Sequence, residues 1–458
     1  MERLTLENIA RLAGGRIKPE DGRIQASGVC TDSRTVKAGD LFVALKGDRF
    51  NGHDFLETAA LGGAVAALVE QGEMKKRQSP LPMVLVDDVL AGFQTLAGRY
   101  RETLPAKTVG VAGSNGKTGT KELIAAVLGV RFSTTKNEGN LNNHIGVPAS
   151  LLRLNAGYEM GVFEAGTNHP GELMPLLKLI RPEAGVVTCI GEEHLEFFRD
   201  LAGVAQEEGA MAEVLPADGL LALKADDPWS EKLAARCHAR IAWFGFGPRA
   251  VYRAGDLKMG MKTTDFTLFT PVGTIHVELP LVGRHQVGNA LAAAAIGEFF
   301  GLSLAEIRQG LENVKPARMR MEQRMTRDGV TILNDAYNAN PNSMLAAFTA
   351  LSEMPVEGRR LAVLGAMREL GDSSAEEHRR VGRELVSRGM DFVVVVGGEA
   401  AGIAEGVRSI GAAKIQLRQF DAMDEAAAFV RREARRGDAV LLKASRGVAL
   451  EQIAKDWD

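Results

Sequence analysis

One short segment of the sequence has residue types that suit the binding of a nucleoside triphosphate. It reads GSNGKT, residues 113–118, and lies between an apolar run and a stretch of helix-forming residues. Small residues let backbone N–H groups approach phosphate oxygens, and the N-terminus of the next helix adds a favourable dipole. Lys117 can reach the terminal phosphates, and Thr118 can place its hydroxyl on Mg²⁺. We therefore predict a strand, a phosphate-binding loop and a helix.

The loop departs from the strict pattern GxxxxGK[ST], because Val111 occupies the first position of that pattern. A guanine-nucleotide switch would also carry an NKxD element that reads the base, and the sequence has none. A regulatory nucleotide-binding protein without catalytic activity is nevertheless one hypothesis that these residues leave open. Such a protein would hydrolyse its nucleotide slowly without any further substrate, whereas a ligase would release phosphate only with both substrates present.

Polar residues follow two other predicted strands, at the edge where parallel sheets bind ligands. Glu164 comes at the end of the run GVFE, and could hold Mg²⁺ opposite Thr118 or lie in a surface loop. His194 follows the strand-like run VVTCI, within the loop GEEHLEFF. Imidazole is an uncommon Mg²⁺ ligand, so the residue type alone favours a solvated histidine.

Asparagine and histidine cluster in two further loops, and a third segment, rich in asparagine, has the composition of a turn. They are NEGNLNNHIGVP at 137–148, GTNHPGE at 166–172 and DAYNANPNSM at 335–344. Ordered polar loops of this kind carry function more often than cores do. The third loop follows a strand just after a predicted domain break, so we expect it to close over a nucleotide held by the preceding domain.

Strand and helix patterns alternate along most of the chain, which indicates an α/β protein of three domains. We expect residues 1–104 to form a small mixed α/β domain. Residues 105–314 contain short apolar runs separated by helices, which favour a mostly parallel, doubly wound sheet around the phosphate loop. Strand and helix patterns alternate again in residues 315–458, which predicts a C-terminal domain of Rossmann-like fold. Its Gly397 and Gly398 follow a strand without a GxGxxG motif, so we interpret them as a turn.

The bulk composition excludes several classes of partner. The 458 residues include 55 Lys and Arg against 58 Asp and Glu, a net charge of −3, so no nucleic acid is expected. The three cysteines lie far apart, which argues against a disulfide framework or a zinc site. The opening residues lack the apolar core of a signal peptide, and no apolar run reaches about 18 residues. We expect a cytoplasmic protein without a membrane span.

Taken together, the motifs resemble those of the Mur ligases of peptidoglycan synthesis, over essentially the whole chain. The resemblance begins with TDSRTVKAGDLFVALKG at 31–47 and includes GSNGKT, GEEHLEFF and the three polar loops. It continues through GRHQVGNALAAAA at 283–295 to KASRGVALE at 443–451. GSNGKT marks the superfamily, whereas the polar loops resemble the member that adds D-alanyl-D-alanine.

The resemblance implies an ATP-dependent peptide ligase that uses ATP and Mg²⁺. ATP would phosphorylate the terminal carboxylate of UDP-N-acetylmuramoyl-tripeptide, and the amine of D-alanyl-D-alanine would attack the acyl phosphate. It also implies a UDP-substrate domain at 1–104, a central ATP-binding domain at 105–314 and a ligase domain at 315–458. Nothing in the sequence points to an obligate protein partner, so we expect a monomer. Phosphoryl transfer depends on positioning and charge neutralisation, which is consistent with a loop, a lysine and metal ions.

The resemblance also implies roles for individual residues. The implied catalytic residues are Lys117, Glu164, His194 and Arg318, to which we add Glu208 as a hypothesis. The implied nucleotide-binding residues are Gly113, Ser114, Asn115, Gly116, Lys117, Thr118, Gly119, Asn289, Arg318 and Asp335. The implied substrate-binding residues are Ser33, Arg34, Lys46, Asn142, Asn143, His144, Asn168, Tyr337 and Asn338. The implied metal ligands are Thr118, Glu164 and His194, and we add Glu208 as a hypothesis.

The sequence departs from the family at the helix after GEEHLEFF, where a carbamylated lysine is common. The segment 203–215 reads GVAQEEGAMAEVL and contains no lysine. Our hypothesis is that Glu208 supplies the missing carboxylate to the second Mg²⁺, directly or through a water, so that activity does not depend on bicarbonate. Glu207 is the rival, although it points about 100° away on the same helix.

Three other departures are expected to matter less. Gly119 replaces a common Thr or Ser, Gln286 replaces an Asn, and Ala366 replaces an acidic residue. An alternative within the same fold is a ligase for another acid or amine, such as folylpolyglutamate synthase, against which the UDP-type first domain argues. The sequence does not distinguish a lysine from a diaminopimelate in the tripeptide.

Overall fold

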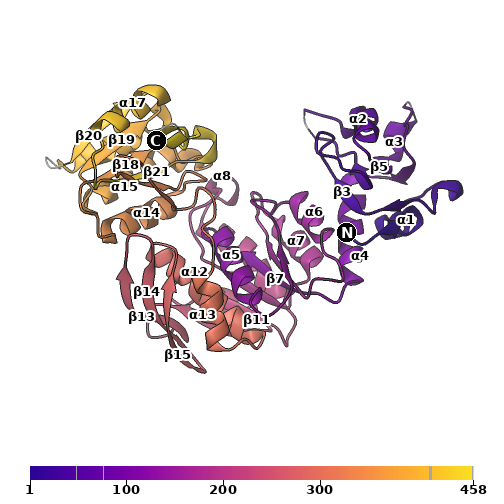
Figure 1. The fold of residues 1–458 in the computed structure, drawn as a ribbon, viewed down its shortest axis with the longest axis horizontal. Coiled ribbons are helices and arrows are strands. Elements are labelled where there is room, and N and C mark those ends of the chain that lie inside the picture. The colour runs from indigo at the N-terminus through magenta and orange to yellow at the C-terminus, as the bar shows by residue number, and fades with distance from the viewer. Residues whose placement is uncertain (48, 76, 412–414, 456, 458) are drawn as a thin grey trace.

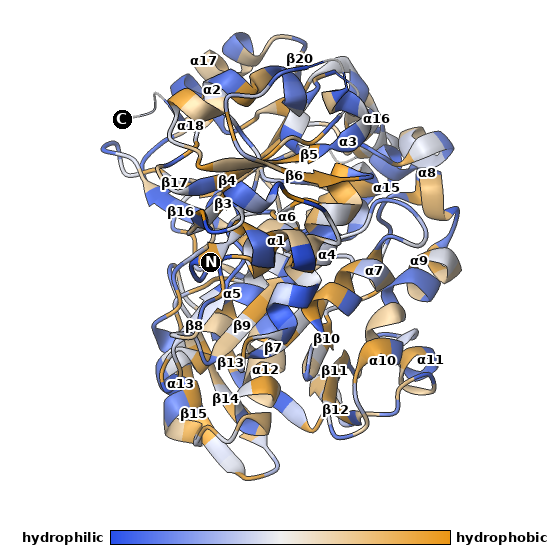
Figure 2. Ribbon diagram, turned by 90° about the vertical axis from the view of Figure 1, so that its right-hand side faces the viewer, coloured by the Kyte–Doolittle hydropathy of each residue, from blue (hydrophilic) through white to orange (hydrophobic). Residues whose placement is uncertain are grey.

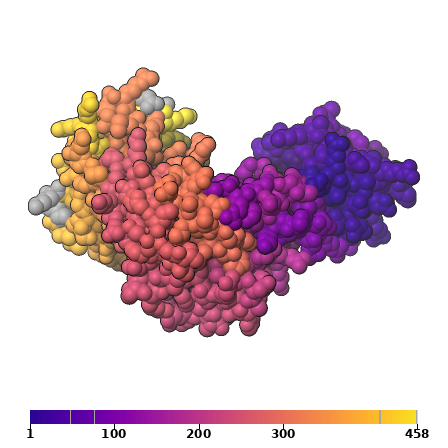
Figure 3. All heavy atoms as spheres, turned by 60° about the horizontal axis from the view of Figure 1, so that its bottom comes forward, coloured from indigo at the N-terminus to yellow at the C-terminus, as the bar shows by residue number. Residues whose placement is uncertain are grey.

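The computed structural model describes residues 1–458 except 48, 76, 412–414, 456 and 458. The chain forms three lobes, each built around its own sheet (Figure 1). The first lobe, in indigo, and the third, in yellow, rise from either side of the central lobe. Figure 3 shows the first lobe standing apart from the third, with the central lobe joining them. The predicted α/β architecture of three domains is therefore confirmed.

The first lobe contains a four-stranded parallel sheet of order β3-β4-β5-β6, and a separate antiparallel pair, β1 and β2. Its strands are β1 (Leu4–Thr5), β2 (Gln25–Ala26), β3 (Gly28–Cys30), β4 (Asp40–Val43), β5 (Ala66–Glu70) and β6 (Met83–Val86). Its α-helices are α1 (Leu6–Ala13), α2 (Leu56–Leu61), α3 (Gln71–Met74) and α4 (Val89–Glu102). Helix α4 runs from this lobe towards the central one and packs on helices of both.

The central lobe contains a nine-stranded sheet of order β15-β14-β13-β12-β11-β10-β7-β9-β8. Its first six strands are β7 (Lys107–Ala112), β8 (Thr134–Lys136), β9 (Met160–Glu164), β10 (Ala184–Val187), β11 (Leu220–Lys224) and β12 (Arg240–Gly245), all parallel. The last three are β13 (Tyr252–Met259), β14 (Thr264–Thr270) and β15 (Gly273–Leu279). Strand β13 pairs parallel with β12, and β14 and β15 follow as antiparallel strands. The predicted sheet is mostly parallel, with an antiparallel edge that the sequence analysis did not predict.

Helices cover both faces of the central sheet. The α-helices of this lobe are α5 (Lys117–Leu128), α6 (Gly146–Leu151), α7 (Leu173–Ile180), α8 (Leu195–Phe198), α9 (Leu201–Glu208), α10 (Ala210–Val214), α11 (Ser230–Ala234), α12 (Arg284–Phe299) and α13 (Leu304–Glu312). Helix α12 is rich in alanine and packs closely on α5, which carries the phosphate loop at its start. In Figure 2 orange, hydrophobic residues alternate with blue, hydrophilic ones along the helices, as expected for helices that bury one face.

The third lobe contains a six-stranded sheet of order β16-β17-β21-β18-β19-β20, in which β16 is the single antiparallel edge strand. Its strands are β16 (Glu322–Met325), β17 (Thr331–Asn334), β18 (Arg360–Leu364), β19 (Phe392–Val396), β20 (Gln416–Phe420) and β21 (Ala439–Lys443). Its α-helices are α14 (Pro341–Glu353), α15 (Ser374–Val386), α16 (Ala401–Ser409), α17 (Met423–Glu433) and α18 (Gln452–Lys455). Among the described residues, no helix combines the length and apolar character needed to cross a membrane.

Candidate active site

The predicted phosphate loop joins the end of β7 to the start of α5, and two of its glycines are required by its shape. Gly113 has φ of 111°, and a Cβ there would lie 2.4 Å from the hydroxyl of Thr188. Gly116 has φ of 86°, and its Cβ would lie 2.8 Å from the side-chain oxygen of Asn289. Positive φ and close approach both favour glycine, so any side chain at either position would deform the loop.

Strand β7 lies between β9 and β10, and all three are parallel. Their carboxyl ends therefore meet at one edge of the sheet, as expected for a ligand site in an α/β protein. This geometry brings the phosphate loop, Glu164 at the end of β9 and the loop after β10 together. The segments are far apart in sequence, and the sheet order alone makes them neighbours.

Lys117 is held inside the loop rather than extended into solvent. Its Nζ donates to the carbonyl of Gly113 at 2.5 Å and lies 3.3 Å from Glu193 Oε2. Burial alone would lower the pKa of Lys117, but the charges of Glu193, Glu208 and Glu164 raise it. Lys117 is therefore a charged group surrounded by carboxylates. Glu193 was not predicted from the sequence, although it follows a buried strand at the same edge of the sheet as Glu164.

Glu164 is buried and makes the contacts expected of a residue opposite the phosphate loop. Its Oε2 accepts the hydroxyl of Thr118 at 2.8 Å, and its Oε1 accepts Nδ2 of Asn142 at 2.8 Å. Thr118, Glu164 and Asn142 come from α5, β9 and the loop 137–145. The structure thus brings together Thr118 and Glu164, which were predicted to face each other, and Asn142, which the family resemblance implied.

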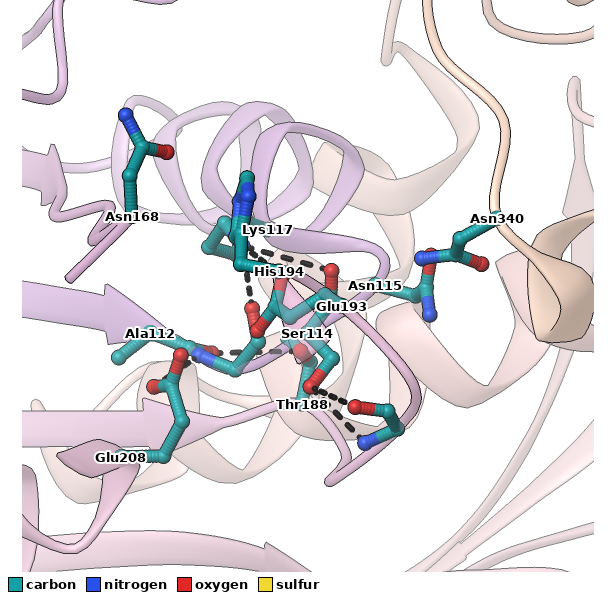
Figure 4. A network of polar contacts seen from close by, with 12 residues as sticks. Ala112, Ser114, Asn115, Lys117, Asn168, Thr188, Glu193, His194, Glu208 and Asn340 are labelled. Carbon is teal, nitrogen blue, oxygen red and sulfur yellow. Dashed lines mark hydrogen bonds and ion pairs between the residues drawn. The ribbon is translucent and has the colours of Figure 1, made fainter. Parts of the chain in front are cut away.

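Glu208 lies against the phosphate loop from below, as Figure 4 shows. Its side chain is buried, and its Oε2 accepts the backbone N–H of Gly113 at 2.6 Å. Burial, followed by the charge of Glu193, raises the pKa of Glu208 to about 8. One oxygen of Glu208 and one of Glu193 are buried without a hydrogen-bond partner among the described residues. Both oxygens are available to a further ligand.

Glu207 faces a different loop and is not equivalent to Glu208. It accepts the backbone N–H groups of Gly171 and Leu173, each at 2.7 Å. It also accepts the hydroxyl of Thr167 at 3.3 Å. Helix α9, which begins at the side-chain cap of Asp200, therefore presents one glutamate to the phosphate loop and the next to the loop 167–173.

The loop containing His194 lies at the contact between the central and third lobes. His194 has φ of 47°, and its Nδ1 lies 2.8 Å from Glu369 Oε2 of the third lobe. Arg380 pairs with Glu192 at 2.5 Å across the same boundary. The phosphate loop makes a further link, because Asn340 Nδ2 donates to Asn115 Oδ1 at 2.9 Å. The third lobe thus contacts two loops of the site.

A cleft of about 1320 Å³ connects these loops across all three lobes. Pockets for one small ligand usually measure about 300–1,000 Å³, so this cleft can hold more than one ligand. The predicted residues that line it are Ser114, Asn115, Gly116, Lys117, Gly119, Asn142, Asn143, His144, Glu164, Asn168, His194, Asn289, Asp335, Tyr337 and Asn338. Gly113 and Thr118 do not line the cleft but bond to Lys117 and Glu164, which do, and Glu208 bonds to Gly113.

The predicted residues of the first lobe lie away from this lining. Ser33 and Arg34 follow β3, and Lys46 follows the parallel neighbour β4, so both groups lie at one edge of the four-stranded sheet. Arg34 is paired with Asp32 at 2.6 Å, and Lys46 with Glu73 at 3.0 Å. The first lobe therefore has its own polar edge, separate from the lining of the phosphate-loop cleft.

Two predicted residues of the third lobe differ in their placement. Asp335 lines the cleft, where its Oδ2 accepts the ammonium of buried Lys443 at 2.5 Å. Arg318 is exposed and does not line the cleft in this structure, whereas Arg320 lines it and lies 4.2 Å from the Tyr337 ring centroid. Arg318 would have to move in order to reach a nucleotide bound at the loop.

Two of the departures from the family pattern are neighbours in space. A Cβ at Gly119 would lie 3.2 Å from Oε1 of Gln286 and 3.1 Å from Nδ2 of Asn289. The longer amide of Gln286 thus occupies room that a side chain at 119 would need. Ala366, the third departure, is buried, and its carbonyl accepts the N–H of Ser445, so an acid there would be removed from solvent.

The donor set around Lys117 suits Mg²⁺. Glu164, Glu193 and Glu208 are buried, and their carboxylates outnumber the ammonium groups of Lys117 and Lys121 around them. Carboxylate and hydroxyl oxygens are the ligands that Mg²⁺ prefers, usually with water and substrate phosphates completing the shell. Among the described residues no three His, Cys, Asp or Glu side chains are grouped so that they could hold a metal ion by themselves. Such an open arrangement fits a metal ion that is shared with a nucleotide.

Family models match the chain in three successive segments. They are the Mur ligase family catalytic domain at 25–101, the Mur ligase middle domain at 111–297, and the Mur ligase glutamate ligase domain at 319–446. A relative from Bacillus subtilis (strain 168), named UDP-N-acetylmuramoyl-tripeptide–D-alanyl-D-alanine ligase, is 36% identical over 457 residues. That alignment covers 100% of this chain and 98% of the relative.

Solved structures agree with the sequence comparison. MurF from Acinetobacter baumannii superposes with a TM-score of 0.90 at 30% identity, covering 100% of this chain and 99% of that one. MurF ligase from Thermotoga maritima in complex with ADP has a TM-score of 0.83 at 29% identity, covering 94% and 97%. Since full-length relatives exceed 30% identity and the family models follow one another along the chain, this protein belongs to the Mur ligase family.

Proposed function

We propose that the protein is an ATP-dependent ligase that joins D-alanyl-D-alanine to UDP-N-acetylmuramoyl-tripeptide for peptidoglycan synthesis. Its full-length relatives and structural neighbours carry that activity in their names. The observation that carries the proposal for this chain is the cleft itself. Its lining brings the phosphate loop, the loops 140–144 and 166–172, and the third-lobe loop 335–343 around one space. A ligase for three substrates needs such a shared space.

The reaction needs activation because a carboxylate is a poor electrophile. Transfer of the γ-phosphoryl group of ATP to the terminal carboxylate gives an acyl phosphate, and attack by the dipeptide amine gives a tetrahedral intermediate. Loss of phosphate then leaves the new peptide bond. In phosphoryl transfer the protein contributes mainly by positioning the reacting groups and neutralising their charge. Lys117 and the N–H groups of the phosphate loop are placed to do both.

In this proposal Thr118 and Glu164 hold one Mg²⁺, and His194 and Glu208 serve a second one. Mg²⁺ would neutralise charge on the phosphate oxygens as the phosphoryl group is transferred. The direct contact between Thr118 and Glu164, at 2.8 Å, supports the first pair. The partnerless buried oxygen of Glu208 supports its part in the second. The Nδ1 atom of His194 contacts Glu369 of the third lobe, so His194 would have to leave Glu369 if this nitrogen is to bind the second Mg²⁺.

The remaining roles follow the family resemblance and stay proposals. Gly113, Ser114, Asn115, Gly116 and Gly119 would surround the phosphates, Asn289 the adenine and Asp335 the ribose. Ser33, Arg34 and Lys46 would bind the UDP end of the tripeptide substrate. Asn142, Asn143, His144 and Asn168 would meet its peptide, and Tyr337 and Asn338 the dipeptide side of the cleft. We also propose a cytoplasmic monomer with domain limits near residues 104 and 314.

The decisive assay mixes the protein with ATP, Mg²⁺, UDP-N-acetylmuramoyl-tripeptide and D-alanyl-D-alanine, and identifies the product by mass. We expect UDP-N-acetylmuramoyl-pentapeptide, and phosphate release only when both acceptor substrates are present. Comparing tripeptides that end in lysine and in diaminopimelate will determine which one the enzyme prefers. Absence of the pentapeptide with both tripeptides would reject the proposed function.

Closure of the third lobe should bring Arg318 to the γ-phosphate, although it is exposed in this structure. We expect Arg318→Ala to lower kcat by about 30-fold, or ~2 kcal/mol of barrier, because one charge is lost from the transition state. Arg320→Ala is the matched variant. Arg320 lies over the ring of Tyr337, which we assign to the dipeptide side of the cleft, so the Arg320→Ala substitution should change the KM for D-alanyl-D-alanine more than kcat. A larger kcat loss for Arg320→Ala than for Arg318→Ala would reverse the two roles.

Gly119 and Gln286 should be energetically coupled, because the amide occupies space beside the glycine. We expect Gly119→Ser to raise KM for ATP by about fivefold, since Gln286 and Asn289 must shift. Gln286→Asn should remove most of that effect in the double variant, as neighbouring sites are not additive. Steady-state kinetics of the four proteins measures the coupling. Additive effects would show that the two departures are independent.

A further inference from the structure

Lys121 is a fully buried lysine that has no part in the reaction proposed above. It lies on α5, one turn after Thr118, so both side chains face the same side of that helix. Lysine is almost never completely buried unless its charge is paired, because removing an ammonium group from water is costly. The partners of Lys121 therefore indicate what the residue does.

Those partners belong to one loop and to the end of one strand. The ammonium group donates to the carbonyls of Asn137 at 2.8 Å and Gly139 at 3.2 Å. It also lies 3.8 Å from Glu164 Oε2 and 3.5 Å from Glu122 Oε1. Lys121 thus connects the helix of the phosphate loop to the loop 137–144 and to Glu164.

The same loop is fixed a second time by Asn137, whose side chain is also fully buried. Its Oδ1 accepts the N–H of Glu164 at 3.0 Å, and its Nδ2 donates to the carbonyl of Glu164 at 2.9 Å. The Asn137 side chain therefore continues the pairing of β8 with β9 to the last residue of β9. Lys121 and Asn137 hold the start of the loop from two directions.

The far part of the loop reaches both the site and the first lobe. Asn142 donates to Glu164 Oε1, and its carbonyl accepts the N–H of Gly166 at 2.8 Å. The carbonyl of His144 accepts Nε2 of Gln94, which belongs to α4, at 2.9 Å. The loop 137–144 is therefore a physical link from α5 to the lobe proposed to hold the UDP end of the substrate.

We propose that Lys121 is a positioning residue for the ligation reaction. It acts by fixing the loop 137–144, which places Asn142 beside Glu164 in the cleft and joins the central lobe to the first lobe. Lys121 itself touches neither substrate nor nucleotide. The inference rests on the proposed function, because it assigns to this loop the binding of the UDP-linked tripeptide.

Lys121→Met keeps the length of the side chain and removes its charge and its donors. We expect the Kd for UDP-tripeptide, measured by calorimetry without ATP, and its KM to rise about tenfold or more. The Kd for ADP in EDTA should change by no more than about twofold, because the phosphate loop is untouched. Lys136→Met is the matched control. Lys136 is partly exposed and pairs with Glu122, so its removal should leave these constants unchanged.

A second variant tests whether the effect passes through the loop. Asn137→Ala should produce the same selective loss of tripeptide affinity. The Kd of the double variant for UDP-tripeptide should be at most about twice the Kd of the worse single variant, because both substitutions act on one loop. If Lys121→Met does not fold, Asn137→Ala carries the test alone, because it releases the same loop without a change in α5.

The outcomes separate this inference from the proposed function. If the unmodified protein forms no pentapeptide, the proposed function fails. If it is active, but Lys121→Met lowers only the melting temperature and leaves the tripeptide Kd and KM unchanged, the positioning role is wrong. An equal loss of ADP affinity in EDTA would also overturn it, because the effect would then pass through the phosphate loop. Additive losses in the double variant would exclude action through the loop.

Discussion

Replacing Lys117 with methionine is expected to lower kcat for ligation by about a thousandfold or more, equivalent to ~4 kcal/mol of transition-state stabilisation. Lys117 is the ammonium group inside the phosphate loop, and its Nζ contacts the carbonyl of Gly113. The transferred phosphoryl group carries its charge through the transition state, and a preorganised cation there needs no reorganisation. Quenched-flow or steady-state measurement of ADP formation with all substrates present tests the expectation.

The same substitution should also affect the free protein, because Lys117 is surrounded by buried carboxylates. Removing it leaves the buried carboxylate of Glu193, 3.3 Å away, without its cation. Breaking a buried ion pair from one side commonly costs about 3–5 kcal/mol, so the melting temperature should fall clearly. Lys107→Met, at the exposed start of β7, is the control. It should lower neither kcat nor the melting temperature. A Lys117→Met protein that keeps a tenth of the wild-type rate, about one log unit of loss, would contradict the role.

Glu208 is the second position where a large effect is expected. Glu208→Gln should lower kcat by about a hundredfold, because the carboxylate proposed to serve the second Mg²⁺ loses its charge. The amide oxygen can still accept the N–H of Gly113, so the loop should keep its shape. The wild-type rate should not respond to added bicarbonate, since a glutamate needs no carbamylation.

Glu208→Lys provides the sharper experiment, because it restores the residue that the family commonly has. Its ammonium group would face Lys117 in a buried site, which is unfavourable unless carbamylation turns it into a carboxylate. We therefore expect little activity without bicarbonate and a clear increase with it. Glu207→Gln is the control and should not acquire bicarbonate dependence, because Glu207 faces the loop 167–173. Wild-type activity in Glu208→Gln across a Mg²⁺ titration would reject the hypothesis.

Much of the fold could be predicted because its signals are local. The small residues at 113–116 between an apolar run and a helix indicate the phosphate loop. The short apolar run that ends at Glu164 indicates a buried strand. Neighbouring parallel strands have their carboxyl ends at one edge of the sheet. The phosphate loop after β7 and Glu164 at the end of β9 were therefore expected to lie together, as the contact of Thr118 with Glu164 shows. The family resemblance and the three-domain α/β class are confirmed for the same reason.

The contacts that were missed depend on partners distant in sequence. Nothing local distinguishes Lys121 from a surface lysine, because its burial depends on how the loop 137–144 folds over α5. The bond between Asn340 and Asn115 depends on how the third lobe sits on the central one. Glu193 was one of two adjacent glutamates, and only the turn after β10 decides which of them faces Lys117. The antiparallel edge formed by β14 and β15 was not predicted, because its strands alternate buried and exposed residues and lack the continuous apolar run of a strand buried on both faces.

In the proposed reaction the γ-phosphoryl group of ATP is first transferred to the terminal carboxylate of the tripeptide, and is released as phosphate only when the dipeptide amine attacks. The most direct test of these steps uses UDP-N-acetylmuramoyl-tripeptide whose terminal carboxylate is labelled with heavy oxygen, incubated with ATP, Mg²⁺ and D-alanyl-D-alanine. An acyl phosphate must transfer one carboxylate oxygen to the released phosphate, so mass spectrometry should find labelled phosphate together with the pentapeptide. Unlabelled phosphate released alongside the pentapeptide would contradict the account.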